Sequence, residues 1–385
     1  MPQYNNPISS KLPQTGTSIF TIMSKLATEH EAINLSQGFP DFAIDVKLVK
    51  LVVKHLKGGK NQYAPMQGIP ELRQAIAKKF ETCYKASYDA DTEINVVSGA
   101  TQGLYTAMSA FIEEGDEVIL FTPAYDSYAP GVILHGGLPK YVELRAPDYS
   151  IPWDQVKKLV SQRTRMIIIN SPHNPTGKTL SKEDMLELEK ITSNSEILVL
   201  SDEVYDHILF DGKKHQSACL FPGLAERSFI VGSFGKIFHV TGWKMGYVLA
   251  PANLMAEFRK AHQYQVFTSN SFLQYALAEF LSVKNNFLAL AKFYEEKRDY
   301  FVNGLKGSRF KVLPAEGTYF QLLDYSAISD KADVDMARDL TIEKKIASIP
   351  VSVFYQNKID DNVLRFCFAK KKETLDKALE ILQKI

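Results

Sequence analysis

Several short polar clusters in this chain carry groups that bind anions, stack on rings or move protons. The first cluster, Ser98-Gly99-Ala100-Thr101-Gln102, offers hydroxyls and small residues at an expected helix start, where free backbone N–H groups bind phosphate. Later clusters supply a ring at Tyr125, an amide at Asn174, a carboxylate at Asp202, a phenol at Tyr205, and an amine at Lys236 between Ser233 and Lys244. Phosphate donors, an aromatic face, a carboxylate and an amine are therefore all available.

Each cluster taken singly has an ordinary structural explanation. Ser, Thr and Gly commonly form turns and helix caps. The segment Asn174-Pro175-Thr176-Gly177 is by itself a turn signal, and most lysines are solvated charges. Tyr125 and Phe267 would by default be core residues. The joint occurrence of the clusters in one order is what points to chemistry.

The elements that must position these groups are seven short apolar runs. The runs are residues 94–97, 117–121, 140–143, 166–170, 197–201, 228–232 and 246–250. Helix-like segments at 102–113 and 182–193 separate several of them, which favours an α/β layer with mostly parallel strands. Their nearly continuous apolar character indicates strands covered on both faces. Functional residues of such sheets gather beyond the carboxyl ends of the strands, so the polar clusters that follow these runs should meet.

The pattern changes beyond about residue 285. A long charged helix candidate is followed by strand-like runs at 319–323 and 363–368, which predicts a second, smaller α+β domain. We expect residues 1–34, helical around 18–29, to form an N-terminal arm or part of the small domain, residues 35–284 to form a large domain, and residues 285–385 to form the small domain. A continuous helix should join the domains. The arm could pack on either domain or on a neighbouring subunit.

Composition excludes several classes of protein. The chain has 385 residues, 45% hydrophobic and 23% charged, which is typical of a globular protein of about two domains. A net charge of +1 and the lack of a long basic run argue against a nucleic-acid partner. The N-terminus does not resemble a signal peptide, and no apolar run is long enough to span a membrane. Three scattered cysteines fit a reducing compartment and neither a disulfide framework nor a zinc site. We expect a cytoplasmic protein without a metal.

Over nearly its whole length the chain resembles the class I aminotransferases of the fold-type I pyridoxal-phosphate family. The resemblance rests on Asn34-Leu-Ser-Gln-Gly-Phe-Pro-Asp-Phe42, Asn61-Gln-Tyr-Ala-Pro65, Asn174-Pro-Thr-Gly177, Ser201-Asp-Glu-Val-Tyr205, Ser233-Phe-Gly-Lys236 and Gly242-Trp-Lys-Met-Gly246. The nearest branch contains methionine and kynurenine (glutamine) aminotransferases. The resemblance implies a large domain, with a seven-stranded, mostly parallel sheet sandwiched by helices, and a smaller α+β domain. It also implies pyridoxal 5'-phosphate as cofactor.

The family's roles carry over to matching positions. Lys236 would hold the cofactor as an imine and then move the substrate's Cα proton as general base and acid. Asp202 would face the ring nitrogen, Tyr205 and Asn174 the ring hydroxyl oxygen, and Tyr125 the ring face. The phosphate would lie among Ser98, Gly99, Ala100, Thr101, Gln102, Ser233 and Lys244, with Tyr63 reaching it from the second subunit of a homodimer.

Arg365 is the best candidate to bind the substrate's α-carboxylate. In strand alternation it shares a face with Val363 and Cys367, where an unpaired charge is costly and a bound carboxylate would offset it. The alternative is an arginine paired within the small domain. Asn174 and the backbone of Gly38 would assist Arg365.

By resemblance, the substrate's side chain would lie against an apolar wall. Its residues are Phe20, Tyr125, Tyr264, Phe267 and Phe354. Such a wall favours methionine, aromatic amino acids, kynurenine or glutamine over aspartate and glutamate, and methionine is the substrate we expect. Thr268 stands where some kynurenine aminotransferases have a histidine, which argues against kynurenine. The amino group would pass to a 2-oxo acid by a ping-pong mechanism.

Two other functions fit the same pattern. The cofactor also supports β-elimination, so a cysteine-conjugate carbon–sulfur lyase is the nearest enzymatic alternative. A lyase releases pyruvate and ammonia, whereas a transaminase releases a 2-oxo acid with the donor's skeleton. A regulator that senses amino acids through an aminotransferase-like domain is a more remote alternative. Intact Lys236 and Asp202 favour an enzyme.

Overall fold

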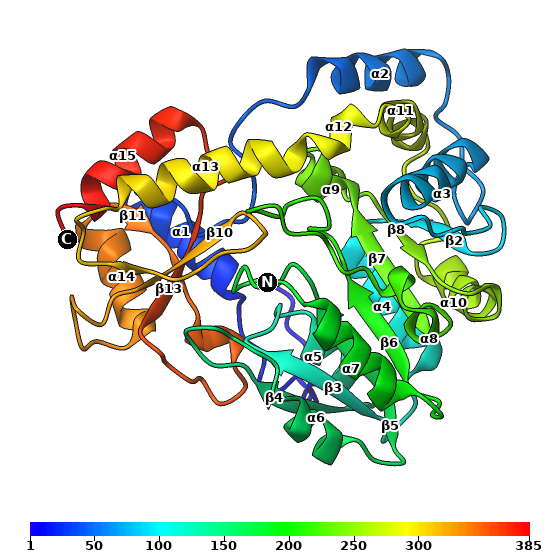
Figure 1. Ribbon diagram of the computed structural model, residues 1–385, viewed down its shortest axis with the longest axis horizontal. Helices are drawn as coiled ribbons and strands as arrows, with labels where there is room; N and C mark the ends of the chain where they lie inside the picture. The colour runs from blue at the N-terminus through cyan, green and yellow to red at the C-terminus, as the bar shows by residue number, and fades with distance from the viewer.

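A seven-stranded sheet forms the centre of the larger part of the molecule (Figure 1). The computed structural model describes residues 1–385. The strands are β2 (Ile94–Val97), β3 (Glu117–Thr122), β4 (Leu138–Glu143), β5 (Thr164–Asn170), β6 (Leu198–Asp202), β7 (Ser228–Ser233) and β8 (Gly246–Leu249). Their order is β2-β8-β7-β6-β5-β3-β4, and only β8 runs antiparallel to its neighbours. The predicted seven-stranded, mostly parallel sheet is confirmed.

Alternate residues of each strand enter two separate apolar layers. In β5, Ile167 and Ile169 belong to one core cluster, and Met166 and Ile168 to the other. Period-two alternation requires this division when both faces are covered. The helices of this part are α2 (Val46–Lys57), α3 (Pro70–Tyr84), α4 (Ala100–Phe111), α5 (Tyr128–Leu134), α6 (Trp153–Leu159), α7 (Lys182–Thr192), α8 (Pro222–Ala225), α9 (Phe234–Ile237), α10 (Ala252–Gln265) and α11 (Ser271–Leu281). The sheet is thus enclosed by helices, as its apolar strands predict.

The remaining elements form a smaller α+β part with an antiparallel sheet of order β12-β13-β10-β9 (Figure 1). They are α12 (Asn285–Leu288), α13 (Leu290–Gly304), β9 (Lys311–Val312), β10 (Phe320–Asp324), α14 (Asp333–Glu343), β11 (Ile346–Ala347), β12 (Ile349–Pro350), β13 (Val363–Cys367) and α15 (Lys372–Leu382). Short 3-10 turns lie at Ala218–Leu220, Thr241–Trp243 and Ser352–Phe354. The helix α13 extends from this part toward the large one (Figure 1). The domain limits at 34 and 284 stay a prediction.

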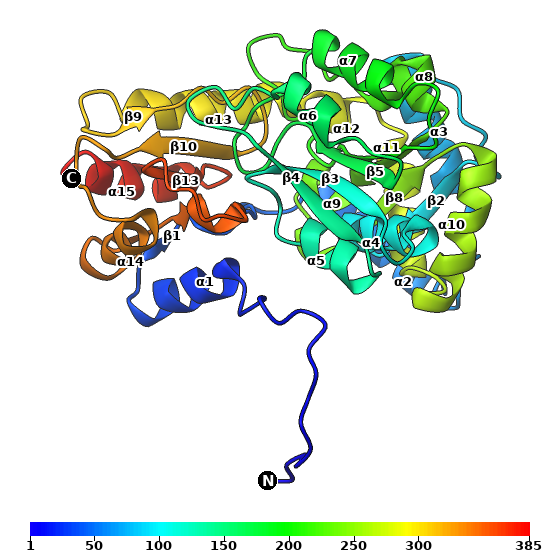
Figure 2. The same cartoon turned by 90° about the horizontal axis from the view of Figure 1, so that it is seen from below.

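The N-terminal segment packs on the smaller part. Helix α1 (Ile19–Glu29), capped by the Ser18 side chain, contacts α14, and β1 (Ile33–Asn34) pairs with β11. Residues 1–10 are exposed and extend away from the body (Figure 2). After β1, residues 34–42, which we name the strap, run along β13, where the Cys367 N–H donates to the Leu35 carbonyl at 2.8 Å. At the end of the strap, the Phe42 ring packs against His239, which follows β7 of the large sheet, at a centroid distance of 4.7 Å.

A buried ion pair anchors the segment that follows β6. Lys79 of α3 donates through Nζ to the Asp206 carboxylate and, at 2.8 Å, to the Tyr247 hydroxyl. The side chains of Lys79 and Asp206 are 0% and 4% exposed. Tyr84 donates to the same carboxylate at 3.3 Å. Breaking a buried pair by removing one partner leaves an uncompensated charge, so this pair holds the backbone just beyond Asp202 in place.

We predict that Lys79→Met lowers the free energy of unfolding by about 3–5 kcal/mol, because Asp206 is left buried without a cation. Adding Asp206→Asn should recover most of the loss. The matched control is Lys78→Met, since the Lys78–Glu81 pair is 66% and 58% exposed and should change stability by less than about 1 kcal/mol. Urea unfolding measures all three. Equal losses in Lys79→Met and in the double variant would contradict this explanation.

Candidate active site

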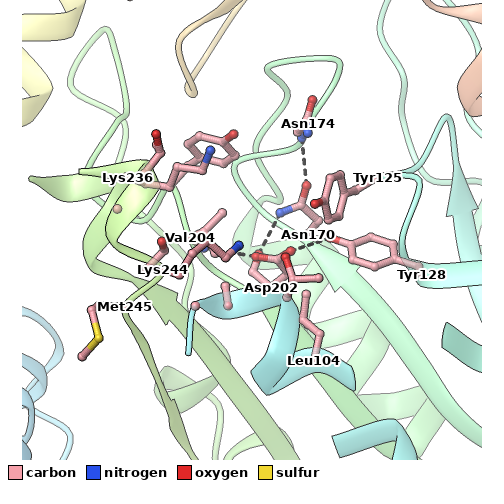
Figure 3. Close-up of a pocket in the computed structure, with 17 residues that line it drawn as sticks. Leu104, Tyr125, Tyr128, Asn170, Asn174, Asp202, Val204, Lys236, Lys244 and Met245 are labelled. Atoms are coloured by element: carbon pink, nitrogen blue, oxygen red, sulfur yellow. Dashed lines mark hydrogen bonds between the residues drawn. The ribbon is translucent and has the colours of Figure 1, made fainter. Parts of the chain in front are cut away.

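Ten of the predicted cofactor-binding residues line one cavity of about 170 Å³ (Figure 3). They are Gly99, Ala100, Thr101, Tyr125, Asn174, Asp202, Tyr205, Ser233, Lys236 and Lys244. The cavity lies where β2, β3, β5, β6 and β7 end, since each of these residues follows or terminates one of those strands. The polar clusters therefore meet at the carboxyl edge of the sheet, as parallel strands require.

One end of the cavity collects hydrogen-bond donors that have no partner. Helix α4 begins at Ala100, and the backbone N–H groups of Ala100 and Thr101 make no hydrogen bond within the chain. Gly99 has φ +83°, and a Cβ there would lie 3.1 Å from Cε of Lys244. Only glycine lets that lysine approach the helix start. The Lys244 amine forms no ion pair, and Ser233 completes the wall. A helix N-terminus and a free cation make an anion site.

Asp202 lies at the floor of the cavity and is 4% exposed. Its Oδ2 accepts a hydrogen bond from Tyr128 Oη at 2.6 Å (Figure 3). Burial raises the pKa of Asp202 to about 6, against the lowering effect of the Tyr128 hydrogen bond. A carboxylate held in this way favours a cation facing it across the cavity.

Asn170 supports both Asp202 and Asn174. The parallel register of β5 and β6 places Asn170 beside Asp202. Asn170 Nδ2 donates to the Asp202 backbone carbonyl at 2.9 Å, and its Oδ1 accepts from the Asn174 N–H at 2.8 Å (Figure 3). Asn170, at the end of β5, thus orients both Asp202 at the end of β6 and Asn174 in the loop after β5.

Lys236 projects into the cavity from α9, the short helix that follows β7. Its Nζ donates to the Tyr319 hydroxyl at 2.9 Å and lies 5.5 Å from the centre of the Tyr205 ring. Burial lowers the pKa of Lys236 to about 8. A substantial share of this amine is therefore neutral near pH 8, which is the form that acts as nucleophile and base.

Arg365 of β13 is the largest fully buried side chain and has no acidic partner. Its Nη1 donates to Asn174 Oδ1 at 2.7 Å, and its Nη2 donates to the Ser36 carbonyl at 2.9 Å. The guanidinium stacks 3.9 Å from the Phe320 ring centre, with Phe20 at 5.3 Å and Phe354 at 5.6 Å. Burial lowers the pKa of Arg365 to about 10. Arg365 is therefore not paired with an acid within the small part, and its contacts reach Asn174 on the cavity wall.

Several predicted residues lie outside the cavity. The Gln102 side chain accepts from the Ser98 N–H at 3.0 Å and approaches Thr106 and His262 through Nε2, so it orients the helix start. The Ser98 hydroxyl contacts that of Ser269 at 3.2 Å. Three aromatic residues, Tyr63, Tyr264 and Phe267, are exposed on the surface, by 83%, 86% and 45%. Within one chain, none of these three lines the site.

Sequence reasoning missed three residues that contact the functional ones: Tyr128, Asn170 and Tyr319. A signal existed for Asn170, because it ends the predicted strand 166–170, and the next predicted strand along the chain, 197–201, is followed directly by Asp202. Tyr128 follows Tyr125 by three residues in the same cluster. No local pattern marked Tyr319, which lies more than 80 residues from Lys236 along the chain.

The residues fit pyridoxal phosphate. Free N–H groups, a hydroxyl and the Lys244 cation suit its phosphate, and the buried Asp202 carboxylate suits a protonated ring nitrogen. Tyr125, whose ring lies 5.7 Å from that of Tyr128, offers a face for the ring. The Lys236 amine, neutral in part, suits the aldehyde. No helix of the chain is both long and apolar enough to cross a membrane.

Known proteins resemble this chain over its whole length. A family model described as aminotransferase class I and II matches residues 30–382. The methionine aminotransferase of Escherichia coli is 48% identical over 99% of this chain and 100% of its own. A kynurenine–oxoglutarate transaminase of Dictyostelium discoideum is 34% identical, covering 98% of this chain and 96% of its own.

Solved structures agree with the sequence relatives. A structure from Escherichia coli, described as a methionine aminotransferase, superposes with a TM-score of 0.97 at 48% identity over 99% of this chain and 100% of its own. The N-succinyldiaminopimelate aminotransferase of Mycobacterium tuberculosis superposes with a TM-score of 0.94 at 35% identity, over 98% and 100%. These comparisons favour amino transfer over the lyase and the regulator. The chain belongs to the aminotransferase class I and II family and is a pyridoxal-phosphate-dependent aminotransferase.

Proposed function

We propose that this aminotransferase takes the amino group of an apolar or aromatic L-amino acid, methionine above all, and passes it to a 2-oxo acid. The observation that carries the proposal is the Arg365 guanidinium, buried without an acidic partner among the rings of Phe20, Phe320 and Phe354. A carboxylate is the natural partner of such a charge. The aromatic rings beside it suit a thioether or an aromatic side chain. A relative 48% identical is a methionine aminotransferase.

The substrate's side chain has no cationic partner in this arrangement. No arginine lines the cavity, and the nearest one, Arg365, is assigned to the α-carboxylate. A second carboxylate, as in aspartate or glutamate, would be buried without a counter-charge at a cost of several kcal/mol. A Cβ at Gly38 would lie 2.6 Å from Cζ of Phe320, so only glycine lets the strap lie this close to the ring. The pocket therefore selects against acidic side chains.

Lys236 carries the proton in the proposed reaction. When bound, pyridoxal phosphate supplies a protonated ring that stabilises negative charge at the substrate's Cα. Asp202, Asn174 and Tyr205 line the same cavity. Asp202 would favour the charged state of that ring, and Asn174 and Tyr205 would contact its edge. The Lys236 amine would take the proton from Cα as general base and, as general acid, deliver it to the cofactor's C4′ carbon, which lies two bonds away on the other side of the amino nitrogen. Its partly neutral state near pH 8 suits both steps.

We also propose that the active unit is a homodimer in the cytoplasm. Tyr63 and Phe267 contact edge to face at 5.6 Å on the surface, and both are exposed, as is Tyr264. Exposed aromatic residues in one area are typical of an interface. A second copy covering them would bring Tyr63 to the phosphate end of its partner's cavity and aromatic residues to the substrate's side chain. Three free, scattered cysteines fit a reducing compartment.

The substrate preference is tested by absorbance. The visible band of the bound cofactor should bleach on adding L-methionine and return with a 2-oxo acid, whereas L-aspartate should act at least about 100-fold less efficiently because its second carboxylate lacks a partner. Arg365→Lys should raise the methionine concentration for half-bleaching about 100-fold, since lysine lacks the bidentate fork. Arg145→Lys, at an exposed pair with Asp361, is the control. A band that responds to aspartate as readily as to methionine would refute the substrate assignment.

The dimer is tested by mixing two inactive variants. Lys236→Ala lacks the amine, and Tyr63→Ala lacks the contact with the phosphate. Because the proposed site combines Lys236 of one subunit with Tyr63 of the other, hybrids regain one intact site, and an equimolar mixture should reach about one quarter of full activity after subunit exchange. Steady-state assays before and after exchange measure the recovery. No recovery, with exchange shown by native mass spectrometry, would place Tyr63 outside the partner's site.

The role of Asp202 predicts a cost in stability. Its folded pKa is raised by burial to about 6, from an ordinary value of 3.8, so the wild type loses stability as pH rises through this range. Asp202→Asn should therefore change the free energy of unfolding of the cofactor-free protein more favourably at pH 8 than at pH 4. The difference between the two pH values should be up to about 3 kcal/mol. With cofactor bound, the variant should be the less stable form. Urea unfolding at both pH values, with and without cofactor, measures this. A pH-independent difference would disprove it.

A further inference from the structure

Tyr319 joins the catalytic lysine to the strap. It precedes β10 directly and is 0% exposed. Its hydroxyl oxygen lies 2.9 Å from Lys236 Nζ and 2.6 Å from the carbonyl oxygen of Gly38. Three segments that are far apart in the sequence thus meet at one phenol: α9, the strap and the start of β10.

The direction of both hydrogen bonds follows from counting protons. A phenol carries one proton, and a backbone carbonyl can only accept. The Tyr319 proton is therefore committed to Gly38, and toward Lys236 the phenol oxygen can act only as an acceptor. Burial raises the pKa of Tyr319 well above its ordinary value, so the phenol keeps this proton in the range near pH 8 in which the Lys236 amine changes charge.

The state of the lysine amine follows in turn. A neutral amine has two N–H bonds and one lone pair. A phenol that donated to Lys236 would occupy the lone pair and suppress its reactivity. A phenol that accepts takes one N–H and leaves the lone pair free. We propose that Tyr319 is a positioning residue for Lys236: with its own proton held by Gly38, it accepts an N–H of the neutral amine and leaves the lone pair directed into the cavity.

This inference rests on the proton-carrying role proposed for Lys236, and it assigns a function to the strap. The Ser36 carbonyl accepts from Arg365 at 2.9 Å, and the Gly38 carbonyl accepts from Tyr319 at 2.6 Å. The strap therefore contacts both the candidate carboxylate-binding residue and the residue that orients the amine. A shift of the strap would release the Tyr319 proton from Gly38 and let the phenol donate to the lysine.

The test is Tyr319→Phe, which removes only the oxygen and keeps the ring against Tyr205 and Tyr294, at centroid distances of 5.3 and 5.7 Å. The matched control is Tyr294→Phe. Tyr294 is equally buried and adjacent, and its hydroxyl has no hydrogen-bond partner. Cofactor-free protein is mixed with pyridoxal phosphate from pH 6 to 10, and the rate of cofactor capture is followed by absorbance.

The expected result has two parts. In Tyr319→Phe the plateau rate at high pH should fall on the order of tenfold, because the amine is no longer oriented. The midpoint of the pH profile, near 8 in the wild type, should move to lower pH, because the ammonium loses an acceptor. Tyr294→Phe should match the wild type in both. A wild-type profile for Tyr319→Phe, or the same fall in both variants, would overturn the proposal.

A second measurement does not need the cofactor. Formaldehyde with cyanoborohydride methylates Lys236 in cofactor-free protein, and mass spectrometry follows the rate at this residue. At pH 10, where the amine is largely neutral in both variants, the rate should fall on the order of tenfold in Tyr319→Phe relative to Tyr294→Phe. If Tyr319→Phe does not fold, Tyr319 can be replaced by 3-fluorotyrosine, which weakens the phenol oxygen as an acceptor without loss of packing. This replacement should lower the midpoint of the pH profile. An unchanged midpoint would refute the proposal. Retention of amino transfer by Lys236→Ala would instead disprove the lysine's own role, whatever Tyr319 does.

Discussion

The cost of burying charge governs how this site is built. Asp202 ends a central strand with almost no access to water, and its neighbours hold it by hydrogen bonds from Tyr128 and the Val204 N–H without supplying a positive charge. Lys236 faces the same cavity and is also buried enough to lose part of its charge. Each group is displaced from its ordinary protonation equilibrium in the direction that burial requires. The cavity therefore suits a ligand with three groups: an anion for Lys244, a ring cation for Asp202 and a reactive carbonyl group for Lys236.

Paired and unpaired buried charges have separate roles here. Lys79 and Asp206 form a closed pair beneath the segment that follows β6, and their charges satisfy each other. Arg365 is as deeply buried as that pair but contacts only neutral oxygens and aromatic rings. Removing one member of the satisfied pair would destabilise the fold, whereas a buried charge without an acidic partner is typical of a ligand-binding position. The paired charges of Lys79 and Asp206 therefore belong to the structural framework, whereas the unpaired charge of Arg365 belongs to the candidate site.

The two parts of the molecule share one apolar core, and at the site they are also joined by polar contacts. Arg365 belongs to the small sheet and donates to Asn174 of the large part. Tyr319 also belongs to the small part, and its hydroxyl accepts from Lys236 of the large part. The strap lies between them and accepts from both. These contacts join the candidate carboxylate-binding residue and the candidate proton-carrying residue in one hydrogen-bonded unit.

The sequence alone determined the strands of the large sheet, the approximate limits of α1, α4 and α7, and the identity of the chemical groups. These depend on neighbours a few residues away: apolar runs define β2 to β8, the Ser18 hydroxyl caps α1, and polar clusters follow strand ends. The resemblance to a known family then assigned roles to Lys236 and Asp202. The tertiary structure decided which groups touch. The Arg365–Asn174 contact spans 191 residues, Tyr319–Gly38 spans 281, and the strand order β2-β8-β7-β6-β5-β3-β4 differs from the chain order. Such contacts follow from the packing of whole layers and from the removal of charge from water, and no local pattern encodes them.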